Sequence, residues 1–155
     1  MPMEDHLVRM ARMVEDFQPQ RVAVDSLSAL ERVFSLRSFR EFVISLTSLL
    51  KQRRITTLFT STTPTLVGGG SVTEKHISTL TDSIILLRYV EMFGEMKRGL
   101  TVLKMRGSMH DKRIREFTID AKGMHLGSPF HNVSGILAGA PVHVNEPESG
   151  DSTHS

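Results

Sequence analysis

The chain has 155 residues, of which 39% are hydrophobic and 23% charged, as expected for a globular domain and not for a disordered chain. It contains no cysteine, which excludes disulfides, a thiol nucleophile and cysteine-bound zinc. No apolar run approaches the ~18 residues of a membrane span, and the N-terminus carries acidic residues where a signal peptide would be basic. We therefore expect a cytoplasmic protein with no membrane partner.

The charges are unevenly distributed along the chain, although the formal net charge is only +2. Seven Lys and Arg residues stand between Lys97 and Arg115, against one acid, Asp111. Residues 141–155 contain three acids, no Lys or Arg and no periodic pattern, which predicts a disordered acidic tail. The basic segment is suited to an anion, which could be a nucleotide phosphate, a nucleic acid or an acidic partner.

The first sixty residues alternate between helix and strand patterns. Apolar residues spaced by four and three predict an amphipathic helix over residues 3–17, and a short buried strand follows over residues 21–24. A second helix, capped by Ser35 or Ser38, precedes a β-branched strand over residues 55–60. The apolar stripe of that helix consists of Phe39, Phe42, Val43, Leu46, Leu49 and Leu50. This alternation indicates a parallel sheet covered by helices.

The second half of the chain is predicted to consist mainly of strands. Residues 61–73 are rich in Ser, Thr, Gly and Pro and predict a mobile loop, and residues 83–90 predict a central strand buried on both faces. Strands over residues 100–105 and 114–119 could form an antiparallel hairpin. A short helix is predicted from Phe130, Val133 and Leu137. The expected fold class is α/β, with a mixed, mainly parallel sheet and flanking helices.

Asp25 ends the first predicted strand. An apolar strand that ends in Asp is the pattern of a Walker B site, in which the carboxylate holds Mg²⁺ beside nucleotide phosphates. Buried strands also end in Asp because Asp begins turns well, so both interpretations stand. The phosphate loop G-x-x-x-x-G-K-[ST] is absent: Gly94 and Gly99 have its glycine spacing, but Leu100 stands where Lys is required. The chain is therefore either no nucleotide enzyme or a part of one.

Donor-rich side chains alternate after the strand over residues 100–105. Lys104, Arg106, His110 and Lys112 recur at period two, so an extended chain would place them on one side, where they would suit a triphosphate. The other interpretation is a solvated hairpin tip. The hydroxyl pair Ser78–Thr79 precedes the predicted strand over residues 83–90. Such pairs usually form turns.

Three segments, in this order and spacing, closely resemble the second ATPase domain of the circadian clock protein family KaiC. They are RVAVDSLSAL from Arg21, HISTLTDSIILL from His76 and KMRGSMHDKRIREF from Lys104. KaiC proteins are RecA-like P-loop ATPases that form hexameric rings with nucleotide between neighbouring subunits. The resemblance implies that residues 1–140 are the C-terminal half of such a RecA-like domain, without the P-loop half.

The resemblance also implies a set of functional residues. Asp25 matches the Walker B aspartate, which implies ATP and Mg²⁺ as cofactors. Ser78 and Thr79 match an autophosphorylated pair, so the implied activities of the full-length family are ATPase and Ser/Thr autokinase. Contacts to nucleotide in the adjacent subunit are implied for Arg98, Lys104, Met105, Arg106, Ser108, His110 and Lys112. The catalytic glutamates and the P-loop are absent from this chain, which is therefore predicted to be inactive alone.

The implied partners are copies of this chain or other KaiC-like subunits, in a ring that is hexameric in the family, and a KaiB-like protein. The short acidic tail is unlike the longer tail with which the clock protein binds KaiA, which argues against KaiA binding. A second interpretation is a non-catalytic module that assembles with KaiC-like subunits. A third, nucleic-acid binding through the basic segment, is disfavoured because the chain has no Trp and one Tyr for base stacking.

Overall fold

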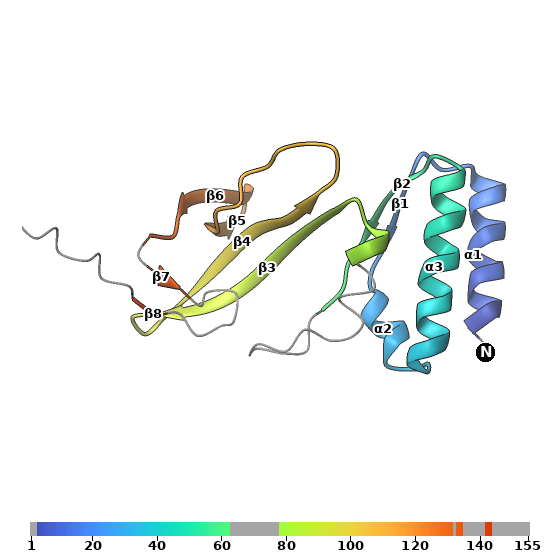
Figure 1. Cartoon of the computed structure of the whole chain (residues 1–155), viewed down its shortest axis with the longest axis horizontal. Coiled ribbons are helices and arrows are strands. Elements are labelled where there is room, and N and C mark those ends of the chain that lie inside the picture. Colours follow the sequence, from blue (N-terminus) through green and yellow to red (C-terminus); the bar gives the residue numbers. More distant parts are fainter. Residues whose placement is uncertain (1–2, 63–77, 132, 135–141, 144–155) are drawn as a thin grey trace, which may run out of the picture. The chain divides into compact units, whose positions relative to one another are not determined.

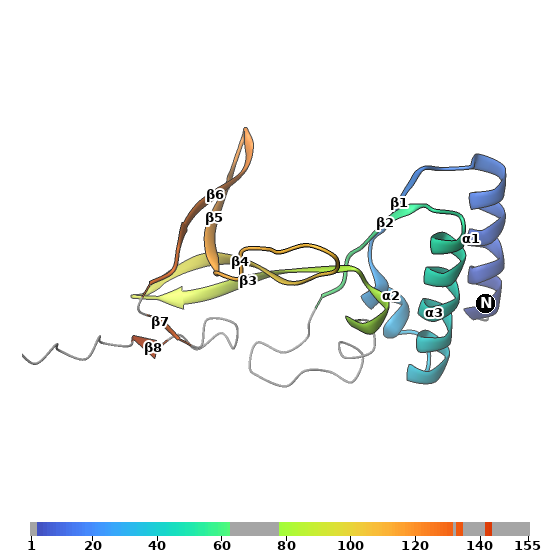
Figure 2. The ribbon, with the colours of Figure 1, turned by 45° about the horizontal axis from the view of Figure 1, so that its top comes forward.

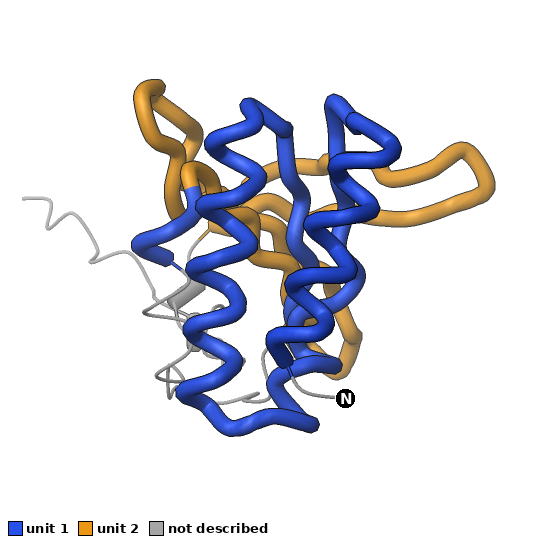
Figure 3. Tube along the Cα trace, turned by 90° about the vertical axis from the view of Figure 1, so that its right-hand side faces the viewer, with its two compact units in different colours: residues 1–65, 70–81 blue, residues 66–69, 82–155 orange. Residues whose placement is uncertain are grey.

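A computed structural model describes residues 3–62, 78–131, 133–134 and 142–143. The chain divides into two compact units, which Figure 3 colours separately. The described residues up to Thr81 form the helical unit, and those from Asp82 onward form the sheet unit.

The helical unit contains two long helices and a pair of parallel strands. Its elements are α1 Met3–Phe17, β1 Arg21–Val24, α2 Leu27–Glu31, α3 Leu36–Gln52 and β2 Thr56–Phe59. α1 and α3 lie side by side in both ribbon views (Figures 1 and 2), and β1 pairs with β2 in parallel. The Oγ atom of Ser35 accepts a hydrogen bond from the Ser38 backbone N–H at 3.2 Å, so Ser35 is the N-cap of α3. The helices and strands predicted for this half are confirmed, but β1 is not buried as predicted, because its residues alternate between an exposed and a partly buried face.

The core of the helical unit is formed by the apolar stripes of its helices. The buried cluster consists of Met3, Val14, Leu27, Phe39, Phe42, Val43, Leu46 and Leu50. Val22, Val24 and Phe59 pack against this cluster, so the helices cover one face of the β1–β2 pair. Ala23 and Leu58 alternate with these residues and are exposed, as the period of two in a strand requires.

The sheet unit is built around an antiparallel sheet with the strand order β3-β4-β5-β6. Its strands are β3 Ser83–Met92, β4 Glu95–Met105, β5 Arg115–Asp120 and β6 Gly123–Pro129. Phe93 and Gly94 form the turn between β3 and β4 with φ of 54° and 76°, because a two-residue turn of type I′ needs positive φ at both positions. Two short strands, β7 Val133–Ser134 and β8 Val142–His143, form a separate antiparallel pair.

The α/β class is confirmed, and the later strands are antiparallel as predicted. Among the described strands, parallel pairing is confined to β1 and β2, which form a sheet of their own, so the predicted mixed and mainly parallel sheet is not observed. β6 has no counterpart in the prediction, since its sequence, GMHLGSP, has neither β-branched residues nor a clear alternation. It forms because it pairs with β5 over most of its length.

The prediction that the strand over residues 83–90 is buried on both faces is wrong. In the described part of the chain β3 is an edge strand that pairs with β4, and its residues alternate between exposed and partly buried. Ile85, Leu87 and Tyr89 are 59%, 51% and 57% exposed. The reason is that a continuous apolar run identifies a strand but does not show whether a second layer covers it.

The last third of the chain also departs from the prediction. Val133 lies in β7 and not in a helix, because three apolar residues are too short a stripe to outweigh strand pairing. Of the predicted tail, Val142–His143 forms β8, and the rest lies outside the described residues, as does most of the predicted loop over residues 61–73. No helix in the described ranges is long and apolar enough to cross a membrane.

Candidate functional site

Asp25 lies directly after β1, at the edge where the carboxyl ends of the two parallel strands meet. Its side chain is exposed, and its Oδ1 atom accepts a hydrogen bond of 2.5 Å from the Thr60 hydroxyl. Thr60 follows β2, and its backbone N–H donates to the Val24 carbonyl at 3.1 Å. The parallel register of β1 and β2 therefore places a hydroxyl donor beside the carboxylate. Sequence reasoning did not identify Thr60, because its role depends on that register.

Hydrogen bonds from the start of α2 hold the segment that follows β2 beside the segment that follows β1. The Leu27 backbone N–H donates to the Thr60 carbonyl at 2.9 Å. The Oγ atom of Ser28, which is buried, accepts a hydrogen bond of 2.7 Å from the Thr62 backbone N–H and lies 3.2 Å from the Ser61 hydroxyl. Because buried hydroxyls are stabilising only when paired, these contacts hold the segments after both strands in one arrangement.

The chemistry of Asp25 fits Mg²⁺. Thr60 engages Oδ1, and no residue in the described part of the chain donates to Oδ2. Magnesium in nucleotide sites is held through one or two carboxylates together with phosphates and water, so a single exposed carboxylate suffices. The described residues contain no group of three or more His, Asp or Glu that could hold a metal without such help.

A basic hollow lies in the sheet unit, between β4 and the loop that follows it. Its volume is about 510 Å³, and it is open to solvent. It is lined by Thr101, Val102, Leu103, Lys104, Met105, His110, Lys112 and Ile114. The structure therefore brings together Lys104, Met105, His110 and Lys112 from the predicted nucleotide contacts.

The other three predicted contacts do not line this hollow. Arg106 is tied to Asp82: its backbone N–H donates to the Asp82 carbonyl at 2.8 Å, and its Nη1 atom donates to Oδ1 at 3.0 Å. Ser108 is exposed and follows Gly107, which has a φ of 80°. Arg98 lies in β4 with its guanidinium 5.5 Å from the centre of the Tyr89 ring, a cation–π contact.

Acidic partners neutralise several cations of the basic segment. Lys97 pairs with Glu116 at 3.5 Å, and Arg106 pairs with Asp82 at 3.0 Å. Arg113 and Arg115 both pair with Asp111, at 2.9 Å and 3.0 Å. The basic side chains that line the hollow are those of Lys104, His110 and Lys112.

The Asp111 carboxylate has the most perturbed pKa of the described groups. Hydrogen bonds from the Arg113 side chain and backbone, and from the Arg115 side chain, hold its pKa well below the usual range. Asp111 therefore stays ionised at any physiological pH. Sequence reasoning noted this residue as the one acid in the basic segment but gave it no role, although its position between His110 and Lys112 was visible.

Ser78 and Thr79 lie in the helical unit, in a helical turn over residues 78–80. Ser78 is partly buried and Thr79 is exposed. The Nζ atom of Lys51 donates to the Leu80 carbonyl at 3.0 Å, and Leu80 packs against the apolar core, so the turn is attached to the C-terminal end of α3.

A family model described as "ATPase: KaiC" matches residues 2–129. The chain is 67% identical over 146 residues to the circadian clock protein KaiC3 of Synechocystis sp., a match that covers 94% of this chain and 29% of the relative. It is 49% identical over 149 residues to the circadian clock oscillator protein KaiC of Synechococcus elongatus, covering 96% of this chain and 29% of the relative. The chain thus spans less than a third of the length of these curated relatives.

Proposed function

Since the chain belongs to the KaiC family of ATPases, we propose that it supplies two parts of an ATP site. One part is the Walker B carboxylate of Asp25, and the other is the basic hollow that contacts nucleotide held by an adjacent KaiC-type subunit. The observation that carries the proposal is the convergence of Lys104, His110 and Lys112 on one open hollow. Three donor side chains around a solvent-open space are suited to a triphosphate.

At the first part, Asp25 would hold Mg²⁺ or its water. Mg²⁺ bound there would neutralise charge on the phosphates. Thr60 donates to Oδ1 and so fixes the rotation of the carboxylate. The P-loop that cradles the phosphates has no counterpart in these 155 residues, so the proposal assigns that part to residues outside this sequence.

At the second part, Lys104, His110 and Lys112 donate to phosphate oxygens, and the Met105 side chain lines the apolar side of the hollow. Arg98, Arg106 and Ser108 are proposed to reach the nucleotide from the rim. Arg106 would have to exchange its exposed contact with Asp82 for a phosphate, and exposed ion pairs are weak enough to allow that exchange.

In this proposal the longer protein is a circadian clock ATPase and Ser/Thr autokinase, and Ser78 and Thr79 are its phosphorylated residues. The exposure of Thr79 is compatible with that role. A KaiB-like partner and a cytoplasmic location belong to the same proposal.

A second candidate function is a non-catalytic assembly module, favoured by the exposed apolar face of β3. Ile85, Leu87 and Tyr89 form this face, and exposed apolar surface of this kind is typical of interaction sites. The proposed occupant is another KaiC-type subunit. The two candidates differ in one respect: a module needs neither Asp25 nor Lys112 for its role.

The proposal is tested by measuring the binding of a fluorescent ATP analogue to the 155-residue chain. We expect weak, salt-sensitive binding that Lys112→Ala reduces, because Lys112 lines the hollow. The matched control is Lys122→Ala, which removes an exposed lysine from the β5–β6 turn outside the hollow. Equal binding by both variants would contradict the nucleotide role and favour the module. Magnesium-dependent ATP turnover by the chain alone, lost on Asp25→Ala, would contradict the assignment of the phosphate cradle to other residues.

A further inference from the structure

Asp111 collects five hydrogen bonds from two neighbouring arginines. Its Oδ1 atom accepts from the backbone N–H of Arg113 at 3.0 Å and from Arg113 Nε at 2.9 Å. Its Oδ2 atom accepts from Arg113 Nη2 at 3.1 Å and from Arg115 Nε and Nη2 at 3.1 Å and 3.0 Å. Because one carboxylate accepts hydrogen bonds from both guanidinium groups, the backbone from 111 to 115 is closed into a compact turn.

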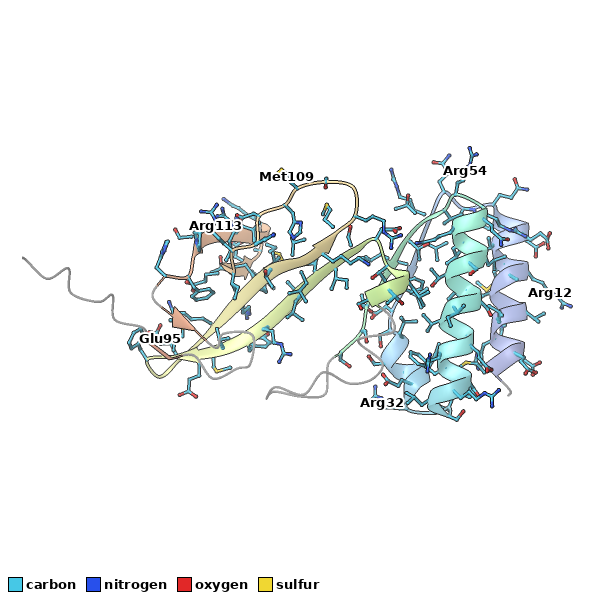
Figure 4. All side chains as sticks on the ribbon, viewed as in Figure 1. Arg12, Arg32, Arg54, Glu95, Met109 and Arg113 are labelled. Carbon is cyan, nitrogen blue, oxygen red and sulfur yellow. The ribbon has the colours of Figure 1, made fainter. Side chains whose placement is uncertain are left out.

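This turn is fastened to the sheet at its far end. Arg115 Nη1 donates to the Gly127 carbonyl in β6 at 3.2 Å, and the Phe130 backbone N–H donates to the Ile114 carbonyl at 2.9 Å. Figure 4 shows Met109 on the arch between β4 and β5 and Arg113 where that arch returns to the sheet. Met109 is fully exposed, so its side chain makes no apolar contact that would hold the arch. The Asp111 cluster is the polar anchor of its returning end.

We propose that Asp111 is a positioning residue for the nucleotide contacts: its carboxylate fixes the loop so that His110 and Lys112 face the hollow. The inference rests on the proposed function and deepens it. Asp111 stands between these two residues in the chain, so the backbone it fixes is the backbone that directs both side chains. Asp111 also pairs with Arg113 and Arg115. Without this carboxylate, the two guanidinium groups would be available to bind the phosphates in a different arrangement.

A positioning role and a purely electrostatic role of Asp111 predict opposite effects of its removal on nucleotide binding. Asp111 carries a negative charge next to two residues that bind an anion, so by charge alone its removal would strengthen nucleotide binding. If instead it positions the loop, its removal weakens binding although the local charge becomes more positive. The sign of the change therefore decides between the two.

The experiment measures binding of a fluorescent ATP analogue to the full 155-residue chain carrying Asp111→Asn. We expect the dissociation constant to rise about tenfold, the scale of one to two well-formed charged hydrogen bonds. The matched control is Asp120→Asn, which removes another exposed carboxylate of the sheet unit, at the end of β5, where it pairs with His125 of β6. This control is expected to leave binding unchanged or slightly stronger.

A second variant, Arg115→Lys, preserves the net charge while removing the paired donors to Asp111 and the contact to Gly127. We expect weaker binding together with faster hydrogen exchange of the Arg113 backbone amide, which a purely electrostatic role of Asp111 would not change. Unchanged or tighter binding by Asp111→Asn overturns the inference. If Lys112→Ala still weakens binding in that case, the proposed function stands, and if Lys112→Ala has no effect, the proposed function fails.

Discussion

The helical unit and the sheet unit solve the problem of stability in different ways. The helical unit buries eight apolar residues in one cluster drawn from three helices. In the sheet unit the buried hydrophobic residues among those described are Val90 and Phe117. The sheet unit is held together instead by strand pairing, above all between β3 and β4, and the exposed ion pairs of Asp111 add little to its stability. The helical unit is thus built around an apolar core, whereas few of the described apolar side chains of the sheet unit are buried.

This difference indicates which unit is more sensitive to substitutions and which unit exposes a surface for contacts with other molecules. A residue in the core of the helical unit touches many neighbours, whereas the apolar face of β3 is open to solvent in this chain. An exposed apolar face of this kind lowers the solubility of a protein, and a partner usually covers it. The sheet unit is therefore the part of the chain that the proposed function uses for contacts with another subunit.

The largest expected effect compares the same substitution in the two units. Leu46→Ala should lower the free energy of unfolding by about 3 kcal/mol, because Leu46 is 2% exposed and its loss leaves a cavity. Leu103→Ala should cost less than about 1 kcal/mol, because Leu103 is 49% exposed. Urea unfolding followed by circular dichroism gives both values. Similar losses in the two variants would remove the distinction between the units.

The sequence could predict most of the helical unit but less of the sheet unit. The stripes of α1 and α3 are long enough for their period to identify both helices. β1 stands out as a short apolar run and β2 as a β-branched segment. β6 and the exposed face of β3 depend on which strands pair and which layers are present, and neither is encoded in a local pattern. Prediction therefore succeeded for elements with a local period and failed for β6 and for the burial of β3.

The residues of the candidate site likewise divide into those that the sequence could predict and those that it could not. A period of two would place Arg106 beside Lys104, His110 and Lys112, but this holds only while the chain stays extended. Gly107, with a φ of 80°, turns the chain, and Arg106 pairs with Asp82. The roles of Thr60 and Asp111 were not predicted because each depends on a partner fixed by register or by a loop.

A smaller effect is expected at the turn on which the sheet unit depends. Gly94→Ala should cost about 1 kcal/mol, because the φ of 76° at this position is unfavourable for a residue with a Cβ atom. The control is Gly127→Ala, at which φ is not positive and the added Cβ would lie 3.4 Å from the Glu116 carbonyl oxygen. Thermal unfolding should show a lower midpoint for Gly94→Ala than for the control. If the two midpoints fall equally, the hairpin turn does not limit the stability of this unit.

The smallest expected effect is a change in the stability of the chain at acidic pH. It arises from the Asp111 cluster, which lies in the sheet unit. The pKa of Asp111 is lowered in the folded chain, chiefly by the Arg113 side chain. Its contribution to stability is therefore fully present above the ordinary carboxyl pKa of about 3.9 and is lost as the pH falls toward the lower folded value. We expect the stability difference between the wild-type chain and Asp111→Asn to be constant near neutral pH and to shrink only in this acidic range. The difference should be small and should decrease with salt, because the pair is exposed. Unfolding measured from neutral to acidic pH at two salt concentrations tests this, and a difference that grows as the pH falls would contradict the assigned sign.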